Sequence, residues 1–251
     1  MKTFDGIQIG KVLNSSFQKN LFKKHYHYSI INLKKNKSYI SDYPNSGSLV
    51  VLNSEKKNSI ITINNRDFNV SKFKFFNFNV QKINISSNSK IKIGIAGIKK
   101  ILKKNKISPL KEKNIYKVVK PWGYELWING QEPTYCFKKI FIKKGTRTSL
   151  QFHKKKIETN FLFEGVAQLS LSKKNGKYSS NVILKNVYYK KLSSGTFMNV
   201  KNFAIHRIEA ITDILLFEVS TPHLDDVIRL SDDNKRKDGR ISKEHLSNKR
   251  F

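Results

Sequence analysis

The sequence has little of the residue types that hold many small proteins together covalently. It contains one cysteine, Cys136, among 251 residues. A single cysteine excludes an intrachain disulfide framework and a cysteine-rich zinc site. No segment approaches the roughly 18 consecutive apolar residues of a membrane span, and Met1–Gly10 lacks the cationic start and apolar run of a signal peptide. We therefore expect a cytoplasmic protein with a reduced thiol and no membrane partner.

Acidic residues are also scarce. The chain has 18 Asp plus Glu against 49 Lys plus Arg, a formal net charge of +31. Of the basic residues, 42 are Lys and 7 are Arg, and the Lys residues are scattered through every segment. Nucleic-acid sites depend on Arg for bidentate contacts, whereas scattered Lys with abundant Asn and Ile is typical of an AT-rich coding sequence. A nucleic-acid partner is therefore not expected, but the charge suits a small anionic substrate such as a sugar phosphate.

Aromatic residues are plentiful, with 17 Phe and 10 Tyr, which argues against intrinsic disorder. Residues 1–98 predict short strands separated by turns rich in Asn and Gly. A hairpin is expected over Ile60–Phe68, turning at Asn64 and Asn65. The predicted strands are Tyr28–Leu33, Leu49–Asn53, Ile60–Ile63, Asp67–Val70, Phe73–Phe78 and Ile91–Ala96.

The second half of the chain repeats this rhythm after a Lys-rich stretch, residues 99–114, that we interpret as a linker or short helix. Many short strands without long helices indicate a β-sandwich or barrel, so the fold class is all-β. A short helix is expected around Leu224–Leu230, and residues 237–251 form a polar tail. The predicted strands are Glu125–Ile128, Cys136–Ile142, Ser149–His153, Asn160–Leu171, Asn181–Leu184, Thr196–Val200, Ala204–Ile208 and Ile214–Ser220.

Four side chains form a candidate metal constellation. Gln151 and His153 are two residues apart, so on a strand they share one face. Glu158 follows after a turn of three lysines, where a returning strand could bring it opposite, and His206 lies on another predicted strand. Three or four such donors pointing into a small barrel would hold a divalent metal ion and leave a position for substrate.

The spacing Gly145-x5-Gln-x-His-x4-Glu-x6-Gly165 resembles the first cupin motif, with Gln in place of its first His. The second motif survives as Gly195 and His206 only. Further segments resemble the cupin domain of type II mannose-6-phosphate isomerases over residues 116–236: Lys120-Pro-Trp-Gly-Tyr-Glu125, Ser149-Leu-Gln-Phe-His153, His206-Arg-Ile-Glu209 and Leu224-Asp-Asp-Val-Ile-Arg-Leu230.

This resemblance implies a jelly-roll barrel with the metal inside, and the similar rhythm of the first half predicts two tandem cupin barrels. The expected divisions are a degenerate cupin over residues 1–98, the linker over 99–114, a metal-binding cupin over 115–236 and the tail over 237–251. The metal ligands would be Gln151, His153, Glu158 and His206, with zinc as the expected ion.

The implied activity is a metal-dependent aldose–ketose isomerisation of a sugar phosphate, for instance in surface-polysaccharide supply. Arg207 would stabilise developing negative charge, with a structural Arg as the alternative, and Lys138 and Arg147 would bind the phosphate. The proton-transfer base stays open among Glu209, Glu164, Lys138 and a metal-bound water. A homodimer is compatible with the pattern.

The pattern also departs from the isomerases. Lys154–Lys156 and Thr159-Asn160 replace expected His and Trp residues, so the substrate is open. The alternatives are a non-catalytic sugar-binding cupin and another metal-cupin enzyme, such as a lyase, epimerase or dioxygenase. Outside the motifs, His25 and His27 lack a third ligand at the family spacing. His223 and His245 are expected at the surface, and Trp122 and Trp127 as packing residues.

Overall fold

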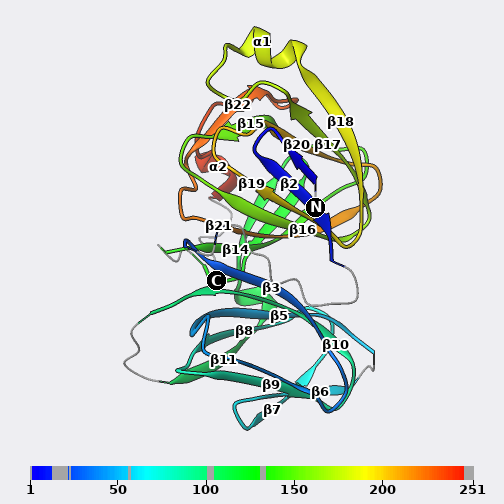
Figure 1. Ribbon diagram of the computed structural model, residues 1–251, viewed down its shortest axis with the longest axis vertical. Coiled ribbons are helices and arrows are strands. Elements are labelled where there is room, and N and C mark those ends of the chain that lie inside the picture. The colour runs from blue at the N-terminus through cyan, green and yellow to red at the C-terminus, as the bar shows by residue number, and fades with distance from the viewer. Residues whose placement is uncertain are drawn as a thin grey trace. The chain divides into compact units, whose positions relative to one another are not determined.

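The computed structural model describes residues 2–12, 22, 24–55, 58–100, 105–130 and 134–245. These residues form two compact units (Figure 1). The N-terminal unit comprises Val12–Ile115 and Ile128–Gly130, and the C-terminal unit comprises Met1–Lys11, Tyr116–Trp127 and Gln131–Phe251. Within the described ranges, no helix is long and apolar enough to cross a membrane.

Two antiparallel sheets build the N-terminal unit. The five-stranded sheet has the order β11 (Lys106–Leu110), β8 (Lys74–Asn79), β5 (Ser46–Ser54), β10 (Ile91–Ile98) and β3 (His27–Leu33). The four-stranded sheet has the order β4 (Ser38–Ser41), β9 (Ile83–Ser87), β6 (Ser59–Ile63) and β7 (Arg66–Val70). Alternate Ile, Val and Phe side chains of these strands form one apolar core.

The predicted hairpin at Asn64 and Asn65 is confirmed. Ile63 pairs with Arg66 across the turn, and the two Asn residues have φ angles of 47° and 63°. Asn tolerates this left-handed region better than most residues, and two such residues in succession match a type I′ turn. The sequence therefore placed this connection correctly.

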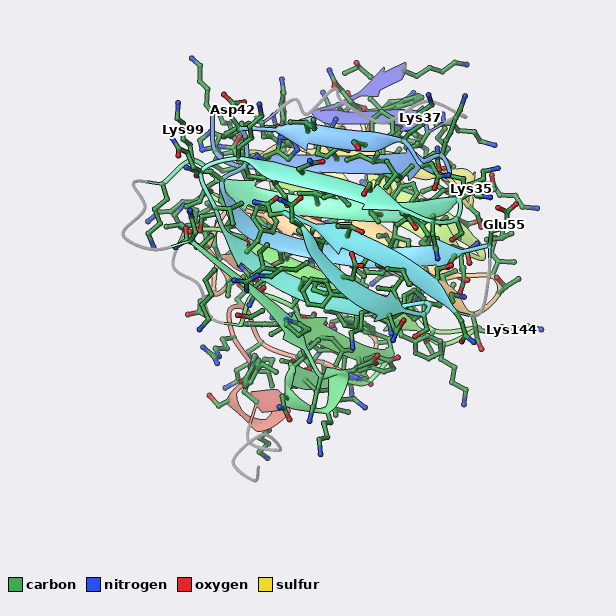
Figure 2. The ribbon with its side chains drawn as sticks, turned by 90° about the horizontal axis from the view of Figure 1, so that it is seen from below. Lys35, Lys37, Asp42, Glu55, Lys99 and Lys144 are labelled. Atoms are coloured by element: carbon green, nitrogen blue, oxygen red, sulfur yellow. The ribbon has the colours of Figure 1, made fainter. Side chains whose placement is uncertain are left out.

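Charged side chains of the N-terminal unit lie around its rim. Figure 2 shows Lys35, Lys37, Asp42, Glu55 and Lys99 extending outwards from the strand ends. All five are exposed. This distribution agrees with the interpretation of the Lys excess as solvated surface charge.

The C-terminal unit contains a larger pair of antiparallel sheets. The eight-stranded sheet has the order β1 (Lys2–Phe4), β2 (Ile7–Lys11), β19 (Thr196–Val200), β16 (Glu158–Glu164), β21 (Ile214–Ser220), β14 (Cys136–Ile142), β13 (Gly123–Trp127) and β12 (Tyr116–Lys120). The five-stranded sheet has the order β18 (Val187–Ser193), β17 (Val166–Ser172), β20 (His206–Ala210), β15 (Leu150–His153) and β22 (Val227–Ser231).

Helical structure is short in the described residues. The helix α1 (Ser180–Lys185) follows β17 and precedes β18, and it is seen at the top of Figure 1. The helix α2 (Ser242–His245) follows β22, and a 3₁₀ turn spans Glu112–Asn114. The predicted strand Asn181–Leu184 is therefore wrong, because these residues belong to α1. The predicted helix at Leu224–Leu230 is also wrong, because β22 pairs with β15 over Val227–Ser231.

The structure moves the expected domain boundaries. Residues 2–11 pair with β19 through β2, so they extend the sheet of the second barrel instead of the first. Lys106–Leu110 was expected in the linker but pairs with β8 as an edge strand of the N-terminal unit. In both cases an unpaired strand edge recruits a distant segment, which local sequence does not reveal. Residues 101–104 of the linker and 246–251 of the tail lie outside the described residues.

The barrel of the C-terminal unit is apolar towards one end and polar towards the other. Ile142, Leu162, Ile214 and Leu216 belong to its main core. Further along the same inward faces the strands carry charged or amide side chains, which form the candidate site.

Candidate metal centre

His153, Glu158 and His206 converge inside the C-terminal barrel. One ligand atom from each residue lies within 4.8 Å of the others, and all three side chains are buried. His206 Nε2 lies 3.3 Å from Glu158 Oε1, and His153 Nε2 lies 3.8 Å from Glu158 Oε2. Three of the four predicted ligands therefore face one point.

Hydrogen bonds at the far side of each imidazole orient the two histidines. His153 Nδ1 lies 2.8 Å from the carbonyl oxygen of Asp226, and His206 Nδ1 lies 3.0 Å from that of Ala204. A carbonyl only accepts, so both Nδ1 atoms carry a hydrogen and both Nε2 atoms face Glu158. This is the tautomer in which imidazole binds a metal through Nε2.

A tight turn brings Glu158 back towards His153. The carboxylate of Asp226 accepts hydrogen bonds from the backbone amides of Lys154, Lys155 and Lys156, two of them at 3.2 and 2.9 Å. These bonds lower the pKa of Asp226, against the effect of its burial. Asp226 thus fixes the turn through its side chain and His153 through its carbonyl.

Strand register sets a row of polar residues across the eight-stranded sheet. Trp127 is opposite Lys138, Lys138 is opposite Glu218, and Glu218 is opposite Asn160. Asn160 Nδ2 donates to Glu158 Oε1 at 3.0 Å. The row therefore leads from Trp127 directly to the carboxylate of the metal centre.

Five buried charges in and beside this row form a chain of contacts that alternates in sign. Lys156 Nζ lies 2.5 Å from Glu158 Oε2 and 2.8 Å from Glu218 Oε1. Lys138 Nζ lies 3.9 Å from the same Glu218 oxygen and 3.0 Å from Glu125 Oε2. Each carboxylate thus has at least one ammonium partner, which buried charges require.

These contacts decide the ionisation of the site. Burial opposes charge on Glu125, but Lys138 and Lys120, with a hydrogen bond from Trp127, lower its pKa to about 2. Burial also opposes charge on Lys138, but the carboxylates beside it raise its pKa. Burial and the nearby Lys156 lower the pKa of His153 to about 3. His153 is therefore a neutral imidazole at physiological pH, as metal binding requires.

Gln151 lies beside the three ligands but presents its nitrogen to them. Its Nε2 is 3.5 Å from His153 Nε2, and its Oε1 accepts a hydrogen bond from Ser149 Oγ at 2.5 Å. Half a turn of the amide would exchange the two atoms. The predicted ligand role of Gln151 stays a prediction that depends on this rotation.

A cavity of about 120 Å³ opens beside the centre. Lys138, predicted as a substrate residue, lines it, as do Glu218 and Arg229. His245 lines it too, although the sequence predicted a surface position. Its ring stacks near Tyr116, with ring centroids 6.0 Å apart.

Arg207 and Arg147 do not line this cavity. Arg207 follows His206 on β20, so its side chain leaves from the opposite face of the sheet, where Nη2 donates to the carbonyl oxygen of Ser231 at 2.6 Å. Arg147 binds Asp233 through two hydrogen bonds of 2.8 and 3.0 Å. The strand bulge that would bring Arg207 inwards is absent from the described β20, so the geometry corrects the expected substrate roles of both residues.

The other residues considered from the sequence lie outside the candidate site. Glu209 and Glu164 do not line the cavity, and Glu209 lies 3.8 Å from Arg147. His27 Nε2 is hydrogen-bonded to Ser29. Among the described residues, His153, Glu158 and His206 form the group of three metal-binding side chains that lie close enough to share an ion, and neither His25 nor His27 belongs to it.

Sequence reasoning gave no role to Lys156, Glu218 or Asp226. A signal was available for Glu218, because it interrupts the apolar run Ile214–Ser220 at an inward-facing position. Lys156 stands in a run of three lysines that reads as a solvated turn, yet only 6% of its surface is exposed. Only the fold shows which of the three lysines turns inwards.

The donor set fits a divalent metal ion. His206 Nε2 is buried and makes no hydrogen bond within the described residues. It faces Glu158 Oε1 at 3.3 Å and the imidazole of His153, so a cation bound between the three groups would contact all of them. Two imidazoles and a carboxylate suit zinc, manganese or iron.

No family model matches the chain, and no curated protein matches its sequence. Solved structures do match. An oxalate decarboxylase from Lactobacillus farciminis aligns at 11% identity with a TM-score of 0.55, covering 92% of this chain and 86% of its own. An IolB-like protein from Salmonella typhimurium aligns at 9% identity with a TM-score of 0.59, covering 88% and 89%.

A salicylate 1,2-dioxygenase from Pseudaminobacter salicylatoxidans aligns at 11% identity with a TM-score of 0.52, covering 80% of this chain and 72% of its own. Such low identities establish shared architecture and not shared chemistry. The neighbours have cupin or bicupin jelly-roll folds, and the alignments extend across both units of this chain. The chain is therefore an all-β protein of the cupin fold, with two jelly-roll units of which the second carries the metal-type side chains.

Proposed function

We propose that the protein is a metal-dependent cupin enzyme that acts on a small anionic sugar, as an aldose–ketose isomerase similar to mannose-6-phosphate isomerase. The observation that carries this proposal is the convergence of His153, Glu158 and His206 beside a cavity lined by cations. The isomerase chemistry itself is supported by the sequence resemblance over residues 116–236. The structural neighbours support only the fold.

His153, Glu158 and His206 would hold the ion, and Gln151 would add a fourth donor after rotation of its amide. A bound divalent ion would supply a Lewis acid that polarises a carbonyl or hydroxyl oxygen. The chain's own residues prepare this position, because the carbonyls of Asp226 and Ala204 orient the imidazoles. All three ligand side chains are buried, which strengthens electrostatic contacts between them.

Proton transfer would fall to a carboxylate inside the cavity. Glu209 and Glu164 lie outside it, and Lys138 is held as a cation. Glu125 is a weak base because its pKa is lowered to about 2. Two lining carboxylates that are not candidate ligands remain, Asp225 and Glu218. Asp225 is exposed, whereas Glu218 is buried and shares Lys156 with Glu158, so we assign the proton-transfer role to Glu218.

The charges of the site favour an anionic substrate once a metal is bound. Glu125, Glu158 and Glu218 with Lys138 and Lys156 leave one net negative charge among the five. A divalent ion would change the net charge of these groups from negative to positive, and Arg229 at the cavity wall would add a further positive charge. A bound ion would therefore strengthen the attraction for an anion of a cavity whose lining already includes the cations Lys120, Arg236 and Arg240.

The decisive experiment couples metal analysis to an assay on mannose 6-phosphate. Purified protein should contain about one divalent ion per chain, and the loaded protein should interconvert mannose 6-phosphate and fructose 6-phosphate. His206→Ala should lose both properties. Glu55→Gln, an exposed position in the N-terminal unit, should keep both. A loaded protein that turns over no aldose or ketose phosphate would contradict the isomerase.

One observation favours a second candidate, a non-catalytic sugar-binding cupin. The Lys156 ammonium already neutralises the Glu158 carboxylate at 2.5 Å. A cation of the chain itself can thus occupy the place beside the ligand. This candidate predicts sugar-phosphate binding without metal uptake, whereas the enzyme predicts that chelation abolishes both binding and turnover.

A further inference from the structure

The chain after β22 closes one side of the cavity. Residues 232–245, here called the C-terminal strap, contribute Arg236, Gly239, Arg240, Ile241 and His245 to the cavity lining. The strap was expected to be a polar tail from residue 237 onwards. Its path is instead fixed by specific hydrogen bonds near its start and near its end.

The start of the strap is tied to β22. Gly239 N donates to the carbonyl oxygen of Val227 at 2.9 Å, and Arg229 N donates to Asp238 Oδ1 at 2.7 Å. Arg229 Nη1 also donates to the carbonyl oxygen of Gly239 at 3.0 Å. These bonds make the first part of the strap an extension of the barrel wall.

The end of the strap is held by the carboxylate of Glu244 in α2 and by His245, whose Nδ1 lies 2.9 Å from the Tyr116 hydroxyl oxygen. Lys120 Nζ on β12 lies 2.7 Å from Glu244 Oε2, and Arg236 Nη1 lies 3.1 Å from Glu244 Oε1. The side chains of Lys120, Arg236 and Glu244 are 12%, 9% and 9% exposed. Two nearly buried cations thus hold one carboxylate, while both cations also line the cavity.

The cavity is too small for the proposed substrate while this contact persists. Its volume is about 120 Å³, whereas ligand pockets usually measure roughly 300–1,000 Å³. Movement of a wall would give a sugar phosphate more room. The end of the strap is the wall that contacts the barrel mainly through Glu244 and the ring of His245.

We propose that Lys120 and Arg236 form the binding site for the phosphate group of the substrate, and that Glu244 fills this site in the ligand-free protein. The inference rests on the proposed function for the identity of the substrate. A phosphate would replace the Glu244 carboxylate on the same two cations and release α2. The cavity would then widen as its substrate binds.

The chemistry of the two cations suits a phosphate. The guanidinium of Arg236 offers Nη1 to the incoming anion while its Nε and Nη2 stay fixed on Asp232 at 3.0 and 2.6 Å. The ammonium of Lys120 supplies a second charge and three donors. A phosphate carries more charge than a carboxylate, so it competes favourably with Glu244.

Binding of inorganic phosphate to the full chain, measured by titration calorimetry, tests the site without any turnover. Glu244→Gln removes the internal competitor and should tighten phosphate binding about ten-fold or more, since a charge-assisted hydrogen bond is replaced. Lys120→Met should weaken it by a similar factor. Glu55→Gln, the same chemical change at an exposed position, should have no effect, and acetate should bind more weakly than phosphate.

Limited proteolysis gives a second test, in which the ligand is expected to increase cleavage. Arg240 and Lys243 are exposed trypsin sites on the strap. Phosphate should increase cleavage there in the wild-type protein, because it releases α2, whereas a ligand usually protects. Glu244→Gln should be cleaved rapidly without phosphate. If phosphate binds equally to wild type and Glu244→Gln, or protects the strap, the displacement model is wrong.

The two proposals fail separately. Phosphate binding that depends on Lys120 and Glu244 in a protein without isomerase activity would leave the anion site intact and reject the enzyme. Isomerase activity in the wild-type protein, with unchanged phosphate affinity in Glu244→Gln and Lys120→Met, would support the enzyme and reject the anion site. Thermal unfolding of each variant checks that the fold is retained.

Discussion

Arg207 Nη2 donates a hydrogen bond of 2.6 Å to the carbonyl oxygen of Ser231, at the point where β22 ends. Arg147 holds the neighbouring Asp233. Two arginines that sequence comparison would assign to a substrate thus anchor the root of the C-terminal strap from outside the barrel. The position of Arg207 on the outer face follows from strand alternation, since His206 points inwards.

Replacing Arg207 should therefore affect stability more than metal binding. Arg207→Ala removes a charge-assisted hydrogen bond and should lower the free energy of unfolding by about 1.5–3 kcal/mol. Urea denaturation measures this loss. Metal affinity, measured by calorimetry, should stay within about three-fold of wild type, and a drop comparable to that of His206→Ala would place Arg207 in the site after all.

The three converging ligands should differ from Gln151 in their effect on metal affinity. His153→Ala or His206→Ala should reduce zinc or manganese affinity more than roughly 100-fold, because changes even in the supporting shell cost 10–100-fold. Gln151→Ala should cost less than ten-fold, since its oxygen is engaged by Ser149. Equal losses for Gln151 and His153 would show that the amide rotates and binds the ion.

The Lys156 ammonium should weaken metal binding, because it places a like charge beside the ligand Glu158. Lys156→Met alone would leave Glu218 without its nearest partner, so the double variant Lys156→Met with Glu218→Gln is the better test. It removes one positive and one negative charge, the positive one being closer to the site. We expect metal affinity to rise roughly ten-fold. An unchanged or lower affinity would mean that Lys156 mainly orients Glu158.

Acid should destabilise the C-terminal unit through Glu125. The pKa of this carboxyl is about 2 in the folded protein, against an ordinary value of 4.5. A lowered folded-state pKa gives stability that is present above pH 4.5 and is lost as the pH falls towards 2. The contribution is about 3 kcal/mol. The difference in unfolding free energy between wild type and Glu125→Gln should therefore shrink between pH 5 and pH 2.5, as measured by denaturation at several pH values.

Much of the fold follows from local sequence. Period-two alternation and Asn-rich turns located most strands and the hairpin at Asn64 and Asn65, because these signals depend on neighbouring residues alone. These local signals did not predict the strands that form only by pairing with a distant segment. The edge strand at residues 106–110 has Pro109 and an exposed Lys106, and only its partner β8 makes it a strand.

The spacing of Gln151, His153 and Glu158, with the resemblance to the cupin motif that added His206, likewise predicted the candidate metal centre. Residues two apart on a strand share a face, and a turn returns the chain. Tertiary structure decided what surrounds it. Alternation sent Arg207 outwards, register placed Lys138 opposite Glu218, and burial selected Lys156 from three equivalent lysines. Charges at these positions interact across strands distant in sequence, so their partners depend on packing that no local pattern encodes.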